Sequence, residues 1–236
     1  MSEKSVLAEG ISLYEKGNYT AALTFFLSLP EESEADIIDM AYYIGLCYAK
    51  LERFDDAMIY LEQVVTTDEN NSKLTQKQEE RILQCRYILA IIYCMGGRKK
   101  LADFELTKLL ETGYKKTQVF SSLAYVAWVS GNDDESLDLY NNALIEDENN
   151  PNALNGMAYV LANRGEELTK ALSMCKKALD LSPENGAYLD TMGLIYYKMG
   201  LYKDSLDFYK KSLKVLGKNE ILEEHMKELE RTIEWN

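Results

Sequence analysis

The sequence predicts an all-α fold, a solenoid of stacked helical hairpins, and three observations lead to this prediction. First, five glycines close successive apolar helical stretches, and the last four lie 34, 34 and 35 residues apart: Gly17, Gly97, Gly131, Gly165 and Gly200. Second, a small residue follows each glycine at a nearly constant interval: Ala22, Ala102, Ser136, Ala171 and Ser205. Third, the three prolines lie outside the helix interiors, and no strand-like alternation competes with the helical period. Self-similarity of this length is typical of proteins in which each repeat buries its apolar face against the next.

The 236 residues divide into six repeat units and a tail, and a hydrophobic content of 47% is enough for a continuous core. We place the units at 3–37, 38–71, 83–116, 117–150, 151–185 and 186–217. In each unit a small residue lies in the middle of the first helix: Gly10, Gly45, Ala90, Ala124, Ala158 and Gly193. Another lies near the start of the second helix, where Ala57 completes the set named above. Small side chains on both helices let the two helices of a hairpin approach closely.

The glycine after each first helix suits the left-handed backbone conformation that ends a helix. The second unit has Glu52 at this position, so we expect its turn to be less well determined. The fifth unit has one extra residue between Gly165 and Ala171, which we place in the turn.

Prolines mark helix ends. Pro30 comes early in the first unit, so its second helix should be short. Asn150-Pro151 and Ser182-Pro183 lie at matching phases of the repeat and resemble helix starts, with a capping residue before a proline that needs no amide hydrogen.

Between the second and third units the period stretches to 45, and the 11 extra residues lie within 71–81. Their composition favours helix, and three turns keep the same face inward. We therefore predict one long helix from about Ser72 to Met95 that projects roughly 16 Å beyond its neighbours. The projection is either a docking prong or a neutral extension. It also suggests a boundary, which gives the parts 1–71 and 72–217.

The tail, 218–236, predicts an amphipathic helix over 219–235 that caps the last apolar face of the stack. Its apolar side would include Ile221, Leu222, His225, Met226, Leu229, Ile233 and Trp235. His225 is then a packing or surface residue and not a catalytic base.

Charge and composition exclude several classes of function. A net charge of −13 without a basic stripe argues against a nucleic-acid partner. No signal segment and no bilayer-length apolar run are visible, so we expect a cytoplasmic protein without direct membrane insertion. The four cysteines form no Cys-x-x-Cys pair, and Cys85 and Cys94 would lie about 13 Å apart along one helix, so we expect reduced and mostly buried thiols. With one histidine and no ligand spacing, we expect no metal site and no cofactor.

The best-formed unit reads Leu189-x-x-Met192-Gly193-x-x-Tyr196, then Gly200, then Ser205-x-x-x-Tyr209, and another reads Ala41-x-x-Ile44-Gly45-x-x-Tyr48, then Ala57-x-x-x-Leu61. The pattern resembles the tetratricopeptide repeat (TPR), although no unit has the tryptophan of the family pattern. The resemblance implies a right-handed α-solenoid of about six TPR hairpins plus the C-terminal capping helix.

In that family the first helices of successive units line a concave groove. The resemblance therefore implies groove-facing residues, which here are mostly aromatic or amide side chains: Tyr42, Tyr87, Gln118, Tyr125, Trp128, Asn152, Asn155 and Tyr159. The sixth unit would add Ala187, Asp190, Leu194 and Lys198. Aromatic rings supply contact area, and amides pair with the backbone of a peptide ligand. These eight residues are our candidate protein-binding site.

We therefore expect a non-enzymatic adaptor or scaffold that binds a peptide segment or helix of a partner protein in the groove. The alternative is a structural subunit of a homo-oligomer or of a larger membrane-associated assembly. An enzyme is disfavoured because the chain has one histidine, no glycine-rich phosphate loop and no nucleophile–base pairing at short range.

Overall fold

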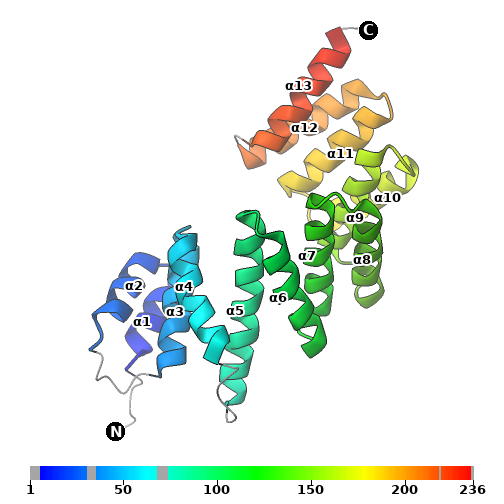
Figure 1. Ribbon diagram of the computed structural model, residues 1–236. Helices are drawn as coiled ribbons and strands as arrows, with labels where there is room; N and C mark the ends of the chain where they lie inside the picture. The colour runs from blue at the N-terminus through cyan, green and yellow to red at the C-terminus, as the bar shows by residue number, and fades with distance from the viewer. Residues whose placement is uncertain (1–5, 31–35, 68–73, 218, 235–236) are drawn as a thin grey trace. The chain divides into compact units, whose positions relative to one another are not determined.

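The computed structural model describes residues 6–30, 36–67, 74–217 and 219–234, and within these ranges the chain forms thirteen α-helices and no strand (Figure 1). The predicted all-α solenoid of helical hairpins is confirmed. By its internal contacts the chain divides into two compact units, which we call the N-terminal unit (Met1–Tyr114) and the C-terminal unit (Lys115–Asn236).

The N-terminal unit holds three hairpins. Its helices are α1 (Ala8–Glu15), α2 (Tyr19–Ser28), α3 (Ile37–Lys50), α4 (Phe54–Thr67), α5 (Gln76–Met95) and α6 (Lys99–Thr112). Each hairpin packs on the next, α2 on α3 and α4 on α5. The boundary that we expected between residues 71 and 72 therefore falls between two helices that pack on each other inside this unit.

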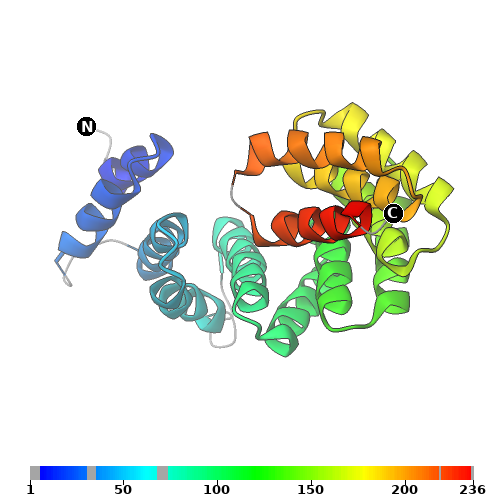
Figure 2. The same cartoon turned by 90° about the horizontal axis from the view of Figure 1, so that it is seen from above.

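The C-terminal unit holds three more hairpins and a final helix. Its helices are α7 (Lys116–Val129), α8 (Asp133–Glu146), α9 (Pro151–Arg164), α10 (Leu168–Leu181), α11 (Gly186–Lys198), α12 (Tyr202–Leu216) and α13 (Glu220–Glu234). The first helices of the hairpins pack side by side, α7 on α9 and α9 on α11. Helix α13 packs on α12 and α11, and Figure 2 shows it alongside α12.

Helix α13 lies within the predicted range and buries Leu222 and Leu229 fully beside Tyr209 of α12. Ile221 and Ile233, which we had also placed on the apolar side, are 49% and 45% exposed. The buried stripe of α13 is thus narrower than the sequence suggests. Trp235 lies outside the described residues.

Small residues do permit the close approach of the paired helices. All twelve predicted positions are buried. A Cβ atom added to Gly193 would lie 2.4 Å from Cδ1 of Tyr209, a distance that real Cβ contacts do not reach. The ring of Tyr209 can be fully buried between the two helices only because position 193 has no side chain.

The turns within the hairpins share one backbone conformation. Four of the five glycines that mark the repeat have φ between 69° and 77°, and Gly131 has φ 84°. Glu52 adopts φ 58°, and its turn is closed by bonds from the N–H of Glu52 to Ala49 and from the N–H of Arg53 to Tyr48. Our expectation of a less determined turn is therefore wrong: the turn is the usual one, and a glutamate occupies a conformation that favours glycine.

One of the two predicted proline caps is correct. Asn150 caps α9, where its side chain accepts from the N–H of Ala153, and Pro151 begins the helix. Ser182-Pro183 is not a helix start, because Ser182 ends α10 and α11 begins at Gly186. Asn185 is the cap instead, since its Oδ1 accepts from the N–H groups of Ala187 and Tyr188. The two prolines therefore lie at different phases of the repeat.

The other local predictions agree with the structure. Helix α2 is short, with 10 residues, and ends just before Pro30. The extra residue of the fifth unit lies in the turn between Gly165 and the start of α10 at Leu168. Three of the four cysteines are buried, Cys94 is partly buried, and all four are free thiols.

The long helix is α5, with 20 residues, and it begins at Gln76 and not at Ser72, which lies outside the described residues. Thr75 and Gln78 form a capping box there, because the Thr75 hydroxyl accepts from the N–H of Gln78 and the Gln78 side chain accepts from the N–H of Thr75.

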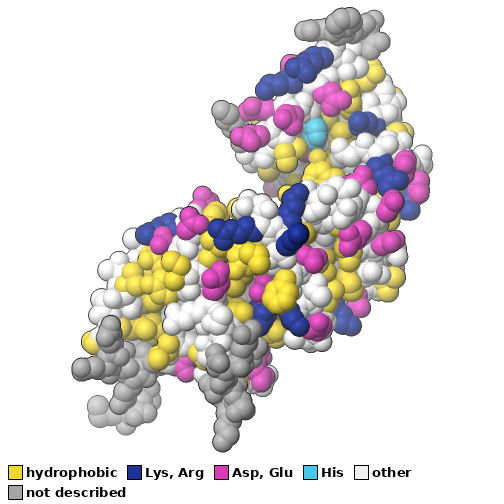
Figure 3. All heavy atoms as spheres, viewed as in Figure 1, with side chains coloured by type: hydrophobic (Ala, Val, Ile, Leu, Met, Phe, Trp, Pro, Cys, Tyr) yellow, Lys and Arg dark blue, Asp and Glu magenta, His cyan; other side chains and the backbone are white. Residues whose placement is uncertain are grey.

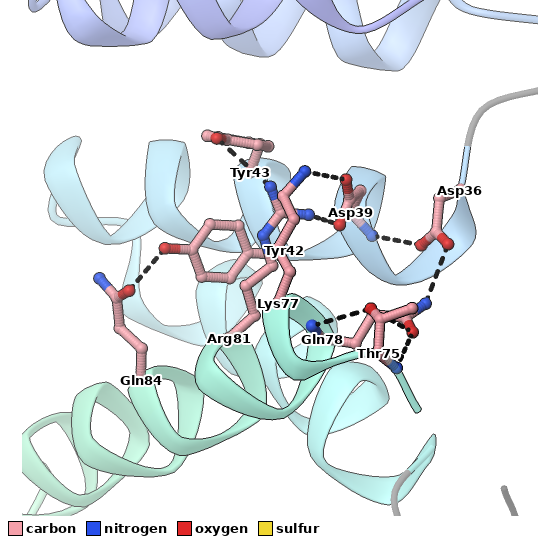
Figure 4. A network of polar contacts seen from close by, with 9 residues as sticks. All are labelled: Asp36, Asp39, Tyr42, Tyr43, Thr75, Lys77, Gln78, Arg81 and Gln84. Atoms are coloured by element: carbon pink, nitrogen blue, oxygen red, sulfur yellow. Dashed lines mark hydrogen bonds and ion pairs between the residues drawn. The ribbon is translucent and has the colours of Figure 1, made fainter. Parts of the chain in front are cut away.

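The first turns of α5 are held against α3 by a polar network (Figure 4). The buried guanidinium of Arg81 pairs with Asp39, and its centre lies 4.9 Å and 5.1 Å from the ring centroids of Tyr42 and Tyr43. Burial lowers the pKa of Arg81. Lys77 also pairs with Asp39, at 3.3 Å. These contacts give the side chains of the extension a structural role inside the N-terminal unit, which favours the extension over a free prong.

Candidate functional site

Five of the eight predicted site residues line one cavity in the C-terminal unit. They are Tyr125 and Trp128 on α7 and Asn152, Asn155 and Tyr159 on α9. The cavity has a volume of about 280 Å³. Its remaining lining comes from α8, α9, α11 and α13 and comprises Tyr140, Gly156, Val160, Ala187, Tyr188, Asp190, Thr191 and Ile221.

One wall of the cavity is a run of aromatic rings. Tyr125 and Trp128 are three residues apart on α7, and their ring centroids lie 5.8 Å apart. Trp128 meets Tyr159 edge to face, with centroids 5.1 Å apart and an interplanar angle of 84°. Tyr125 is 48% exposed, so this wall is open to solvent at one end.

A second part of the lining depends on a glycine. A Cβ atom at Gly156 would lie 2.3 Å from Cζ of Tyr140, so only glycine lets the ring of Tyr140 lie directly against α9. Tyr140 is 6% exposed, and burial strongly raises the pKa of its hydroxyl. Tyr140 was not predicted, because it lies on a second helix and reaches the cavity only across this glycine.

The carbonyl oxygen of Asn152 is held by a hydrogen bond, because the hydroxyl of Tyr188 donates to Asn152 Oδ1 at 2.5 Å. The thiol of Cys175 lies 3.4 Å from the backbone oxygen of Tyr188 and 3.8 Å from Asn155 Oδ1. Burial raises the pKa of Cys175 to about 12, so this thiol stays protonated and can donate at neutral pH. The carboxamide NH2 groups have no hydrogen-bond partner among the described residues and remain as donors for a ligand.

The described lining of the cavity contains an acidic residue and no basic one. Asp190 of α11 is the acidic lining residue, and no Lys or Arg is found among the described residues that line the cavity. Its Oδ1 and Oδ2 lie 2.9 Å and 3.1 Å from Nδ1 of His225 on α13. Burial raises the pKa of Tyr159 first of all, and the carboxylates of Asp190 and Glu224 raise it further.

His225 contacts two residues of the cavity lining, Asp190 and Tyr159. Its ring stacks on Tyr209, with centroids 5.8 Å apart, and lies 6.3 Å from the ring of Tyr159. In Figure 3 the histidine is visible beside hydrophobic side chains, with Asp and Glu side chains nearby. The prediction of a packing residue agrees with these contacts. Its pairing with Asp190, 35 residues away, carries no signal in the sequence.

The other predicted residues do not line this cavity. Gln118 is exposed on α7. In the N-terminal unit Tyr42 is buried, and its hydroxyl donates to Gln84 at 2.7 Å, while Tyr87 is half-buried on α5. Of the sixth-unit positions, Ala187 and Asp190 line the cavity, and Leu194 is buried in the core.

A stack of helical hairpins whose first helices line a shared cavity defines a helical repeat protein of the solenoid class. A family model described as "Tetratricopeptide repeat" matches residues 38–71, which include α3 and α4. This match, together with the stacked hairpins, supports a tetratricopeptide repeat protein.

Individual proteins resemble it more distantly. Photosystem I assembly protein Ycf3 of Prochlorococcus marinus is 31% identical over 93 residues, which cover 38% of this chain and 53% of that protein, so the chain spans about half the length of that relative. A tetratricopeptide repeat protein from Parabacteroides merdae has a TM-score of 0.74 at 12% identity, over 96% of this chain and 85% of the other. YrrB, a TPR protein with an unusual peptide-binding site, has a TM-score of 0.51 at 18% identity, over 89% of this chain and 97% of the other. These structural likenesses show the fold.

In the part of the chain that the structure describes, no helix is both long enough and apolar enough to cross a membrane.

Proposed function

We propose that the protein is an adaptor that binds a peptide segment or helix of a partner protein in the C-terminal cavity. The observation that carries the proposal is that Tyr125, Trp128, Asn152, Asn155 and Tyr159 line one cavity that is open to solvent. Tyr125 and Asn152 are exposed, so an aromatic ring and an amide are both accessible at the cavity, while Trp128 and Tyr159 are partly buried against the core.

The chemistry of the lining supports a peptide ligand. Aromatic rings give contact area at little cost in conformational entropy, and they dominate protein interfaces. The NH2 groups of Asn152 and Asn155 lie on successive turns of α9 and can donate to carbonyl oxygens of an extended segment. The TPR fold is in general a protein–protein interaction scaffold, and the neighbour YrrB is a TPR protein with a peptide-binding site.

The histidine–carboxylate pair does not favour catalysis. A hydrolytic triad needs a nucleophile that is hydrogen-bonded to the imidazole nitrogen that does not face the carboxylate. Among the described residues, His225 hydrogen-bonds only to Asp190, through Nδ1, and the hydroxyl of Thr191 donates to the backbone oxygen of Ala187. We therefore include in the proposal that the protein is not an enzyme.

Affinity purification with quantitative mass spectrometry tests the proposal. Tyr125→Ala and Trp128→Ala should each remove the same partner proteins. The matched control is Phe104→Ala in the N-terminal unit, because Phe104 is exposed to a similar degree, 52% against 48% for Tyr125. Circular dichroism of each variant shows whether it is folded. Partners retained by both cavity variants would contradict the proposal.

The alternative, a homo-oligomeric subunit, is favoured by one observation, the exposure of Ile233 and Ile221 on α13. Light scattering of the full-length protein and of Ile233→Lys separates the two functions. A monomer in both cases agrees with the adaptor. An oligomer that Ile233→Lys dissociates would favour the structural subunit.

A further inference from the structure

We infer that the C-terminal cavity binds a cationic side chain, arginine or lysine, of the partner segment. This inference rests on the proposed function and specifies its ligand. It is carried by the combination of accessible aromatic faces, one acidic group and the absence of basic residues from the described lining.

The aromatic faces suit a cation. A guanidinium or ammonium group is attracted to the face of a tryptophan or tyrosine within about 6 Å of its centroid. The ring planes of Trp128 and Tyr159 are almost perpendicular, at 84°. A cationic group that lies over the face of one ring is therefore oriented differently relative to the other ring. Tyr125, 48% exposed, adds a third ring at the open end.

Asp190 supplies the countercharge. Its side chain is 9% exposed, so solvent screens the carboxylate only weakly. A carboxylate has about four acceptor positions, and one N–H of His225 is shared between its two oxygens. Acceptor capacity therefore remains for the N–H groups of a bound cation.

Other anchoring side chains match the cavity less well. An acidic side chain would meet Asp190 with no Lys or Arg in the described lining to compensate for the repulsion. A purely apolar side chain would gain from the aromatic wall, but it would cover Asp190 without offering a donor. Lysine and arginine combine an apolar stem with a donor head, so the stem can pack on the rings while the head reaches the carboxylate.

Carboxylates near the cavity and the net charge of the chain also favour a cationic ligand. The carboxylates of Asp190 and Glu224 both raise the pKa of Tyr159, after the larger effect of burial, which indicates a negative potential at this ring. The whole chain carries −13, so a basic segment is also attracted from a distance. The NH2 groups of Asn152 and Asn155 would then bind the backbone on either side of the anchor.

A peptide-display selection tests the inference. A random 12-residue library is selected against the immobilised full-length protein, and each enriched peptide is retested on Trp128→Ala. We expect peptides that depend on Trp128 and share an arginine or lysine at one position. The strongest peptide is then titrated calorimetrically, as selected and with citrulline in place of arginine or norleucine in place of lysine. On the unmodified protein, this neutral replacement should weaken binding about tenfold or more.

A charge-matched pair of variants places the effect at Asp190. Asp190→Asn should weaken the binding of the cationic peptide and leave the binding of the neutral peptide almost unchanged. The control, Asp207→Asn, removes the same charge from an exposed position on α12 and should change neither. Peptides that depend on Trp128 but carry apolar or acidic anchors would overturn this inference and leave the proposed function intact. A selection without any peptide that depends on Trp128 would overturn both.

Discussion

Glu52→Gly should stabilise the protein, because Glu52 occupies the left-handed conformation that glycine adopts at the equivalent position of the other hairpins. Its φ is 58°, and its side chain is exposed. A non-glycine residue in this region costs roughly 1–2 kcal/mol. The greater freedom of glycine in the unfolded chain offsets about 0.5–1 kcal/mol of that gain. The net increase in the free energy of unfolding is therefore about 0.5–1 kcal/mol, which corresponds to about 1–4 °C in Tm.

Urea and thermal unfolding followed by circular dichroism measure this change. The matched control is Gly165→Ala, which replaces a glycine in the same backbone conformation by a residue with a side chain. The φ of Gly165 is 69°, and an added Cβ meets nothing within 4 Å, so the substitution affects only the backbone. That variant should lose about 1 kcal/mol. A midpoint for Glu52→Gly that is unchanged or lower would refute the reasoning, because it would mean that the exposed glutamate side chain makes a compensating contribution.

Three further predictions concern packing, charge and titration. Gly193→Ala should lower the free energy of unfolding by about 1–3 kcal/mol in urea denaturation, because the new Cβ meets the buried ring of Tyr209. Arg81→Met should lower it by about 3 kcal/mol and speed hydrogen exchange in α3 and α5, because it leaves Asp39 of the α3–α5 network without its buried partner. The buried thiols should stay protonated at pH 8 and react with a disulfide reagent only as fast as the protein opens, because burial raises the pKa to about 11 for Cys47 and about 12 for Cys85. Since the folded-state pKa values lie above those of the unfolded chain, these thiols stabilise the fold below about pH 9, and the stabilisation is lost as the pH rises toward 11–12.

Each of these has a control. Gly96→Ala should be nearly neutral, because its Cβ would come no nearer than 3.4 Å to another atom. Lys77→Met removes the exposed partner of Asp39 and should cost less than about 1 kcal/mol. Equal losses for Arg81→Met and Lys77→Met would contradict the role of burial. Rapid labelling of Cys85 in the folded protein, or stability that does not change between pH 8 and pH 11, would contradict the titration argument.

The hairpin stack could be predicted from the sequence because its determinants are local. A glycine at each turn and a small residue on each helix repeat with the structural unit, so their spacing gives both the period and the interface. The start of α11 could not be placed in this way. Ser182-Pro183 and Asn185-Gly186 both satisfy the rules for a helix start. The choice depends on Gly186, where a Cβ would lie 2.5 Å from Cγ of Leu216 on another helix.

The site was partly predictable for the same reason. The resemblance to the tetratricopeptide repeat implied that Tyr125, Trp128 and Tyr159 face a groove from first helices, and the structure brings them together at one cavity. The sequence pattern could not show that Tyr42 is buried, because its burial depends on Arg81 and Gln84 of the neighbouring hairpin.

Because the last helix contributes to the cavity, the geometry of the cavity depends on the number of hairpins between α7 and α13. Ile221 of α13 lines the same cavity as the rings of α7 and α9, and His225 joins it to α11. A hairpin duplicated anywhere between α7 and α13 would separate these walls, even if the new hairpin folded perfectly. An added hairpin is therefore compatible with this cavity only if it lies outside the segment from α7 to α13.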